Sequence, residues 1–295
     1  MLSLSQQNHR DIIMQFIFGY FVVVISLFGI FAIAGGHIVG LLQPIEFFMI
    51  IGGTTGVFLA GNSSNTIKST FKVLPTALKG GRYSKAYCVE LIALLHEILG
   101  KTNEELMSIE DDLKNPQSSK TFTKLSKIVS DQLTIEFLAN NLRTLKDGNI
   151  SVNEMGRLMN VQIEAHHLEA IAPANAIAEL KYPTLAFGIA STVLSIIYTL
   201  ESVGIPLEEM GMLTAHGLVG TFLGILLAYG FVAPLGRLLA QRAGESTMIL
   251  QSIKVALLAK LNGCSPMLAV ELGRSALHSS IRPGQSHQNR SAAKA

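Results

Sequence analysis

Four long apolar runs constrain this chain more than any other feature of its sequence. A helix needs about 20 apolar residues to cross the roughly 30 Å hydrocarbon core of a bilayer. Runs of this kind lie at residues 12–35, 44–60, 182–200 and 213–240. The second is short and glycine-rich, and the fourth is long enough to continue beyond the membrane. Because backbone polar groups in hydrocarbon must be satisfied internally, we expect each run to be a membrane-spanning helix.

The placement of basic residues predicts the orientation of these helices. The connections at 36–43 and 201–212 contain no Lys or Arg, whereas basic residues follow the second and fourth runs. The positive-inside rule therefore places both termini and the long middle segment in the cytoplasm. The predicted organisation is a cytoplasmic N-terminal segment at 1–11, membrane helices at 12–60, a cytoplasmic domain at 61–181, membrane helices at 182–240, a cytoplasmic C-terminal helix at 241–282 and a disordered tail at 283–295.

The middle segment is too polar to span a membrane, and its apolar residues recur at helical spacing. One stripe is Tyr87, Leu91, Leu94, Leu95 and Ile98. A second amphipathic helix is predicted from Val129, Leu133, Phe137 and Leu138. No stretch shows the alternation of a strand. The fold class is therefore all-α, a polytopic membrane protein with four transmembrane helices and a large cytoplasmic helical domain.

The third and fourth apolar runs carry small and hydroxyl-bearing residues on one helical face. In the third run these are Gly188, Thr192, Ser195 and Thr199, and in the fourth they are Gly217, Gly220, Thr221, Gly224 and Ala228. Small faces allow helix backbones to approach closely, so Gly217, Gly220 and Gly224 are predicted to pack against a neighbouring helix. Thr192 and Thr221 either line an ion path or bond to carbonyl groups of their own helices.

Charged residues are missing from the third and fourth runs at bilayer depth. Ion relays in membranes normally use an ionisable group. Glu46 is placed near the outer end of the second run, where we expect an interface residue. If this chain moves ions, the carboxylate that binds them is therefore predicted to come from a partner protein.

Nothing in the sequence indicates an enzyme, a cofactor or a metal centre. Cys88 and Cys264 fit no metal-ligand spacing, and no glycine-rich phosphate loop is present. His166 and His167 lie in a charged helical stretch, where we expect them to be solvated. A formal net charge of +2 is too small to indicate nucleic-acid binding.

Several segments of the chain are similar to segments of one known protein family. The most specific are HGLVGTFLGILLAYGFVAPL at 216–235 and LLQPIEFFMIIGG at 41–53. IEDDLKNP at 109–116, APANAIAEL at 172–180 and LLAKLNGCSPMLAVELGR at 257–274 are further matches. In these segments the chain resembles the MotA family of flagellar motor stator subunits. The related ExbB and TolQ energy-transducing subunits have a different loop plan and fit less well.

The resemblance implies a membrane motor in the bacterial inner membrane. Five MotA-like subunits surround a dimer of MotB-like subunits, whose membrane Asp binds the ion, and ion flow makes the ring push a FliG-like rotor protein. The resemblance places Thr221 and Pro234 on the ion path and Glu110 at the rotor, with Glu97, Glu90 and Arg143 as further rotor-interface candidates. The transported ion is expected to be H⁺, with no bound cofactor.

Some positions depart from the family pattern. Leu185 occupies the position of a proline that precedes the third span, and Pro183 lies two residues earlier and is predicted to substitute for it in part. Ser195 replaces a usual Gly, and Asn103 lies where the family has an Arg. Thr192 is typical of sodium-driven relatives, so Na⁺ is the alternative ion. The alternative function is an accessory or degenerate MotA-like scaffold.

Overall fold

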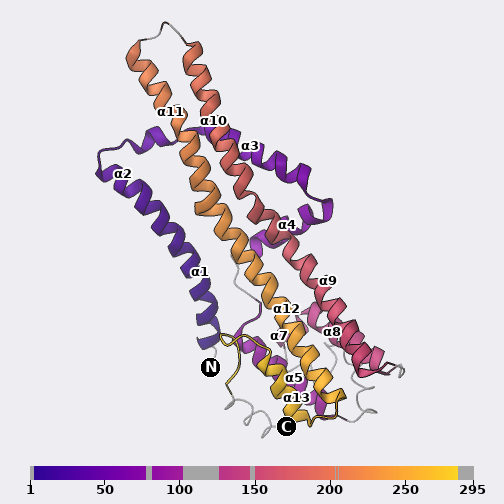
Figure 1. Ribbon diagram of the computed structural model, residues 1–295. Coiled ribbons are helices and arrows are strands. Elements are labelled where there is room, and N and C mark those ends of the chain that lie inside the picture. The colour runs from indigo at the N-terminus through magenta and orange to yellow at the C-terminus, as the bar shows by residue number, and fades with distance from the viewer. Residues whose placement is uncertain are drawn as a thin grey trace. The chain divides into compact units, whose positions relative to one another are not determined.

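The computed structural model describes residues 3–77, 82–101, 126–146, 150–202, 204 and 206–284. All regular elements in these ranges are helices (Figure 1). The chain divides into two compact units, one comprising residues 1–9, 81–169 and 243–295 and the other residues 10–80 and 170–242. Three of the borders fall inside α1 (Ser3–Val24), α9 (Val152–Glu179) and α12 (Ala233–Leu261).

Among the described residues, four helical stretches are long and apolar enough to cross a membrane, which confirms the predicted fold class. They are Met14–Ile33, Ile38–Gly61, Val152–Glu201 and Leu207–Leu261. The last two contain 50 and 55 residues, far more than the roughly 20 that a bilayer requires. The predicted spans at 182–200 and 213–240 are therefore parts of much longer helical stretches.

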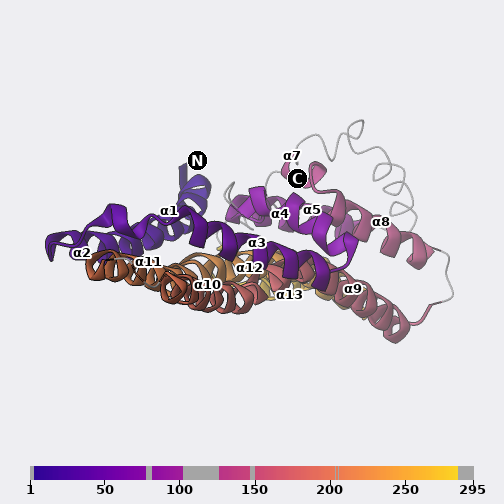
Figure 2. The same ribbon diagram turned by 90° about the horizontal axis from the view of Figure 1, so that it is seen from above.

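The unit of residues 10–80 and 170–242 contains the apolar helices. After α1 come the π-helix η1 (Ile25–Gly29), α2 (Ile30–Ile33), the 3₁₀ helix η2 (Ile38–Leu41), α3 (Pro44–Gly61) and α4 (Ser64–Ala77). Residues 170–242 contribute α10 (Lys181–Glu201), α11 (Leu207–Ile225) and the π-helix η4 (Leu226–Val232). Helices α10 and α11 run side by side in both views, and α3 contacts both of them (Figures 1 and 2).

Two prolines explain irregularities in the long helices. Pro234 has no N–H to donate to the carbonyl of Gly230, and the π-helix η4 lies directly before it. Pro183 likewise cannot donate to the carbonyl of Glu179. The helix is interrupted by a turn at Leu180, between α9 and α10. Each proline thus marks a place where the regular hydrogen-bond ladder is relaxed.

The other unit has a conventional apolar core. It contains α5 (Lys85–Gly100), α7 (Ser126–Val129), α8 (Gln132–Lys146), α13 (Pro266–Ser275) and parts of α9 and α12. The predicted stripe on α5 is confirmed, because its five apolar side chains are at most 1% exposed: Tyr87, Leu91, Leu94, Leu95 and Ile98. Ser84 caps this helix by accepting a hydrogen bond of 3.2 Å from the Tyr87 N–H.

Two helix predictions in this unit need correction. Val129 and Leu133 do not share a helix, because α7 ends at Val129 and α8 begins at Gln132. The region 241–282 is not one helix either: α12 ends at Leu261, and Gly263 has a left-handed φ of +84° that an α-helix does not accommodate. Of the tail predicted at 283–295, residues 285–295 lie outside the described residues.

The break between α7 and α8 contains Asp131, a fully buried carboxylate. The Tyr87 hydroxyl donates to it at 2.7 Å, the Thr134 hydroxyl at 2.9 Å, and the guanidinium of Arg82 lies 3.0 Å away. Burial and this carboxylate raise the pKa of the Tyr87 phenol far above its ordinary value, so the phenol remains a donor. The sequence pattern did not reveal this polar group, which ties α5 to the start of α8.

The two adjacent histidines are not solvated, contrary to expectation. Both are half-buried and connect α9 to α12. His166 Nε2 lies 2.9 Å from the Ser246 hydroxyl, and His167 Nδ1 lies 3.0 Å from the Thr247 hydroxyl. Each histidine of α9 thus has a hydroxyl partner on α12. The residue spacing within α9 alone does not predict these partners.

Candidate functional site

The two predicted ion-path threonines lie together where α10 meets α11. Their hydroxyl oxygens are 2.7 Å apart, and the Thr221 N–H donates to the Thr192 hydroxyl at 2.8 Å. Thr192 is also 3.2 Å from the Gly188 carbonyl of its own helix. Thr192 therefore bonds to its own helix, as one of the two alternatives predicted, and also contacts α11, while the ion-path role stays a prediction. A pair of hydroxyl groups occupies a surface between helices that is otherwise made of small residues.

The glycines of α11 lie where the two helix backbones approach most closely. A Cβ added to Gly224 would lie 2.7 Å from the Gly188 Cα, and one added to Gly217 would lie 3.0 Å from the Ser195 Cβ. A Cβ on Gly220 would lie 2.8 Å from the Ser191 hydroxyl oxygen. The structure therefore places all three predicted packing glycines in positions that leave no room for a side chain.

Glu46 is buried, whereas an ordinary residue at the membrane interface would be exposed. It is only 5% exposed, and its carboxylate accepts hydrogen bonds from the hydroxyls of Ser191 and Ser195, the latter at 2.6 Å. Pro44 begins α3 and puts Glu46 in its first turn, where the helix dipole favours an acidic side chain. The unit of residues 10–80 and 170–242 thus contains a buried carboxylate of its own.

Ser191 was missed by the sequence reasoning, although a signal for it existed. Ser191 and Ser195 are four residues apart, so they project from one face of α10. The carboxylate of Glu46 has two oxygens, and each accepts from one of these serines. A pair of hydroxyls at this spacing in one apolar helix, with a single carboxylate in another, is a pattern that predicts mutual contact.

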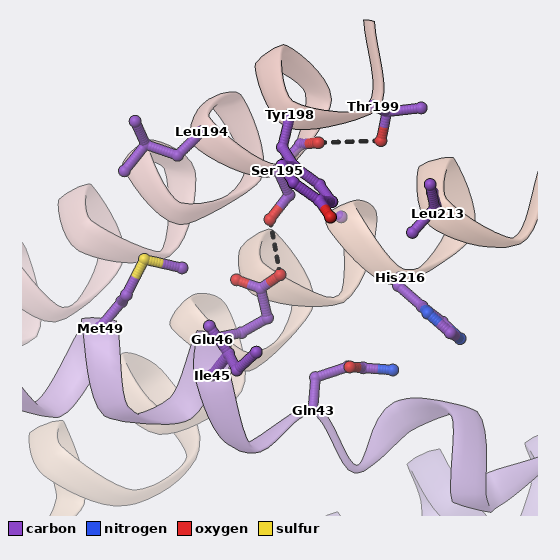
Figure 3. A pocket seen from close by; sticks show the side chains of 11 residues that line it. Gln43, Ile45, Glu46, Met49, Leu194, Ser195, Tyr198, Thr199, Leu213 and His216 are labelled. Carbon is purple, nitrogen blue, oxygen red and sulfur yellow. Dashed lines mark hydrogen bonds between the residues drawn. The ribbon is translucent and has the colours of Figure 1, made fainter. Parts of the chain in front are cut away.

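A cavity of about 430 Å³ opens beside this cluster (Figure 3). In the close-up, Glu46 and Ser195 point toward one another, while His216 comes from the neighbouring helix α11. The lining residues are Gln43, Ile45, Glu46, Met49, Leu194, Ser195, Tyr198, Thr199, Leu213, His216 and Gly217. The cavity therefore presents one carboxylate, one imidazole and several uncharged polar groups within an apolar wall.

The remaining predicted ion-path residues lie at the relaxed points of the long helices. Pro234 is in the first turn of α12, after η4. Pro183 is in the first turn of α10, and Leu185 follows two residues later. The carbonyl of Leu180 at this break accepts from both the N–H and the hydroxyl of Thr184, at 3.0 and 2.6 Å.

Known proteins similar to this chain identify its family. Residues 17–106 match the family described as Motility protein A N-terminal. The chain is 40% identical over 271 residues to Motility protein A of Salmonella typhimurium, and the match covers 92% of each protein. The chain belongs to the Motility protein A family. Motility protein A of Escherichia coli is equally similar, at 40% identity and 92% coverage. The fold matches the structure of C. jejuni MotAB, with a TM-score of 0.75 at 20% identity, covering 92% of this chain and 99% of that one.

The rotor-interface candidates have different surroundings. Glu97 on α5 and Arg143 on α8 are exposed, whereas Glu90 is half-buried and accepts a hydrogen bond from the Lys127 N–H at 3.0 Å. Glu90 thus supports the start of α7. Glu110 and Asn103 lie outside the described residues. Within the described ranges, no group of three or more His, Cys, Asp or Glu side chains is placed to hold a metal ion.

Proposed function

We propose that this chain is the ring-forming membrane subunit of a bacterial flagellar stator, which conducts ions, protons rather than sodium ions, and converts their flow into torque. The observation that carries the proposal is the contact of Thr192 and Thr221 on a glycine-lined surface between helices. Hydroxyl groups on such a surface provide oxygen atoms that donate or accept hydrogen bonds, as a path for protons requires. The 40% identity to Motility protein A over 92% of the chain supports the same role.

The proposed partner is a MotB-like subunit that carries a membrane Asp. Structural neighbours from C. jejuni and Bacillus subtilis are MotAB complexes, which supports a partner of that kind. The proposed assembly is a pentamer of this chain around a MotB-like dimer, acting on a FliG-like rotor protein. The basic residues after the second and fourth apolar runs support an inner-membrane protein with both termini in the cytoplasm.

The test is to remove a hydroxyl without changing side-chain volume. Thr221→Val keeps the branched shape of the side chain and the N–H bond to Thr192 but loses the bond between the two hydroxyls. We expect cells that rely on this variant to lose motility while the protein remains in the membrane. Thr214→Val is the matched control on the same helix, because the Thr214 hydroxyl donates to the Met210 carbonyl of its own helix, at 2.8 Å, and to no other group in the part of the chain that the structure describes. Normal swimming of the Thr221 variant would disprove the ion-path assignment.

A non-conducting scaffold is the second candidate, and the observation that favours it is Leu185. This residue occupies the position of the family's proline, while Pro183 lies in the first turn of α10. Ion flux into cells that co-express the chain with a MotB-like partner lacking its plug separates the two functions. Flux supports the stator, and its dependence on external H⁺ or Na⁺ identifies the ion. Absence of flux above that of the partner alone supports the scaffold.

A further inference from the structure

The buried carboxylate of Glu46 lies at a junction between an open cavity and the contact of α10 with α11. On one side it lines the cavity of about 430 Å³. On the other side its two oxygens accept from Ser191 and Ser195 of α10. A carboxylate in a membrane span is costly to retain, so its surroundings indicate a use.

A second set of contacts connects this cluster to the threonine pair. A Cβ built on Gly220 would lie 2.8 Å from the Ser191 hydroxyl oxygen and 3.1 Å from the Thr192 hydroxyl oxygen. The two oxygens therefore border the same small space and lie at most about 6 Å apart, a separation that one bridging water spans. Thr192 in turn contacts Thr221 at 2.7 Å. The oxygen atoms of Glu46, Ser191 and Thr192 therefore form a series of neighbouring polar groups between the cavity and Thr221.

We propose that Glu46 is a cation-relay group that this chain itself supplies, held in place by Ser191 and Ser195. The inference rests on the proposed stator function and adds to it a second carboxylate besides that of the partner. A cation enters the cavity, binds Glu46 and passes along the hydroxyls of Ser191 and Thr192. Gly220 keeps the space between these hydroxyls open. If the cation is a proton, the Glu46 carboxylate accepts it and then releases it, so that the group is regenerated.

The chemistry of the cluster suits a small hard cation. Carboxylate and hydroxyl oxygens are the ligands that such ions prefer, and the cavity is lined by no Lys or Arg. His216 and Tyr198 are the other titratable side chains in its wall. The competing explanation is a purely structural bond between α3 and α10. Glu46→Gln separates the two explanations. Its amide can still exchange hydrogen bonds with two serines, because hydroxyls donate or accept, but it carries no charge.

The experiment measures ion flux through the complex of the full chain with a plug-deleted MotB-like partner. External H⁺ and external Na⁺ are varied separately to identify the cation. We expect Glu46→Gln to lower the maximal flux about tenfold or more at unchanged amounts of complex, and Glu46→Asp to restore part of it. If the wild-type complex itself conducts nothing, the stator function fails. If it conducts and Glu46→Gln conducts equally well, only the relay is refuted.

Variants of the neighbouring residues separate positioning from passage. Ser195→Ala should raise the half-saturating cation concentration several-fold and leave the maximal flux within about twofold, because it loosens Glu46 without removing an oxygen of the path. Ser191→Ala should also lower the maximal flux, because the Ser191 hydroxyl both holds Glu46 and belongs to the path. Gly220→Ala should lower the maximal flux and leave half-saturation unchanged. Gly211→Ala is the control on α11, since a Cβ there would meet nothing within 4 Å. A uniform loss in all variants, with reduced amounts of complex, would identify the cluster as structural and overturn the proposal.

Discussion

The close approach of α10 and α11 at Gly188 predicts a measurable cost for a single methyl group. In Gly188→Ala the new Cβ would lie 2.6 Å from the Gly224 Cα and 2.9 Å from the Gly220 carbonyl oxygen. Carbon atoms in comfortable contact are about 3.5–4.0 Å apart, so the helices must separate by about 1 Å. Both neighbouring atoms belong to the backbone and cannot rotate away. Overpacking of this kind costs about 1–3 kcal/mol.

The assay is equilibrium unfolding of the purified chain in detergent micelles, followed by helical circular dichroism. We expect Gly188→Ala to shift the midpoint to lower denaturant, because the overpacking cost of about 1–3 kcal/mol exceeds the gain of up to about 1 kcal/mol in helix propensity when Ala replaces Gly. Gly211→Ala is the control, with no atom within 4 Å of its added methyl. Since Ala favours helix over Gly by up to about 1 kcal/mol, this control should be as stable as the wild type or more so. Equal midpoints for the two variants would show that the helices do not approach as described.

Three further predictions concern the unit formed by α5 and its neighbours. Burial raises the pKa of the Cys88 thiol to about 12, so at pH 8 an alkylating reagent should modify Cys264 first and Cys88 only after unfolding, as mass spectrometry would reveal. Tyr87→Phe removes a donor to the buried Asp131 and should cost about 1.5–3 kcal/mol in denaturant unfolding; no change would show that the remaining partners suffice. Ser84→Ala removes the cap of α5 and should cost about 1 kcal/mol in the same assay, whereas Ser84→Asp should not.

The sequence predicts the parts of this fold that depend on periodicity. The apolar stripe of α5 is buried as its spacing predicts, because a helix that covers a core must repeat its apolar residues every three or four positions. The glycines at 217, 220 and 224 lie against α10, since only small residues permit such close backbones. In both cases the information resides within one helix, so a linear pattern is sufficient.

Pairings between polar groups on different helices could not be read from a linear pattern. Asp131 follows a short helix and resembles an ordinary turn residue, yet it is fully buried and accepts from Tyr87. His166 and His167 have the spacing of a solvated surface, but their partners are Ser246 and Thr247, about 80 positions away. Whether a polar side chain is exposed depends on which other helix packs against it. Tertiary packing determines this, and the pattern within one helix does not.

Ser195, where the family usually has Gly, affects both the packing of the helices and the hydrogen bonding of Glu46. Its Cβ already lies at the limit of the space that Gly217 leaves, because a Cβ on Gly217 would be only 3.0 Å away. Its hydroxyl meanwhile donates to Glu46 at 2.6 Å. A Gly at 195 would relieve the contact but leave one carboxylate oxygen without this donor. Ser195→Ala keeps the Cβ and removes only the hydroxyl, so any change that it causes in ion flux arises from the bond to Glu46 and not from the spacing of the helices.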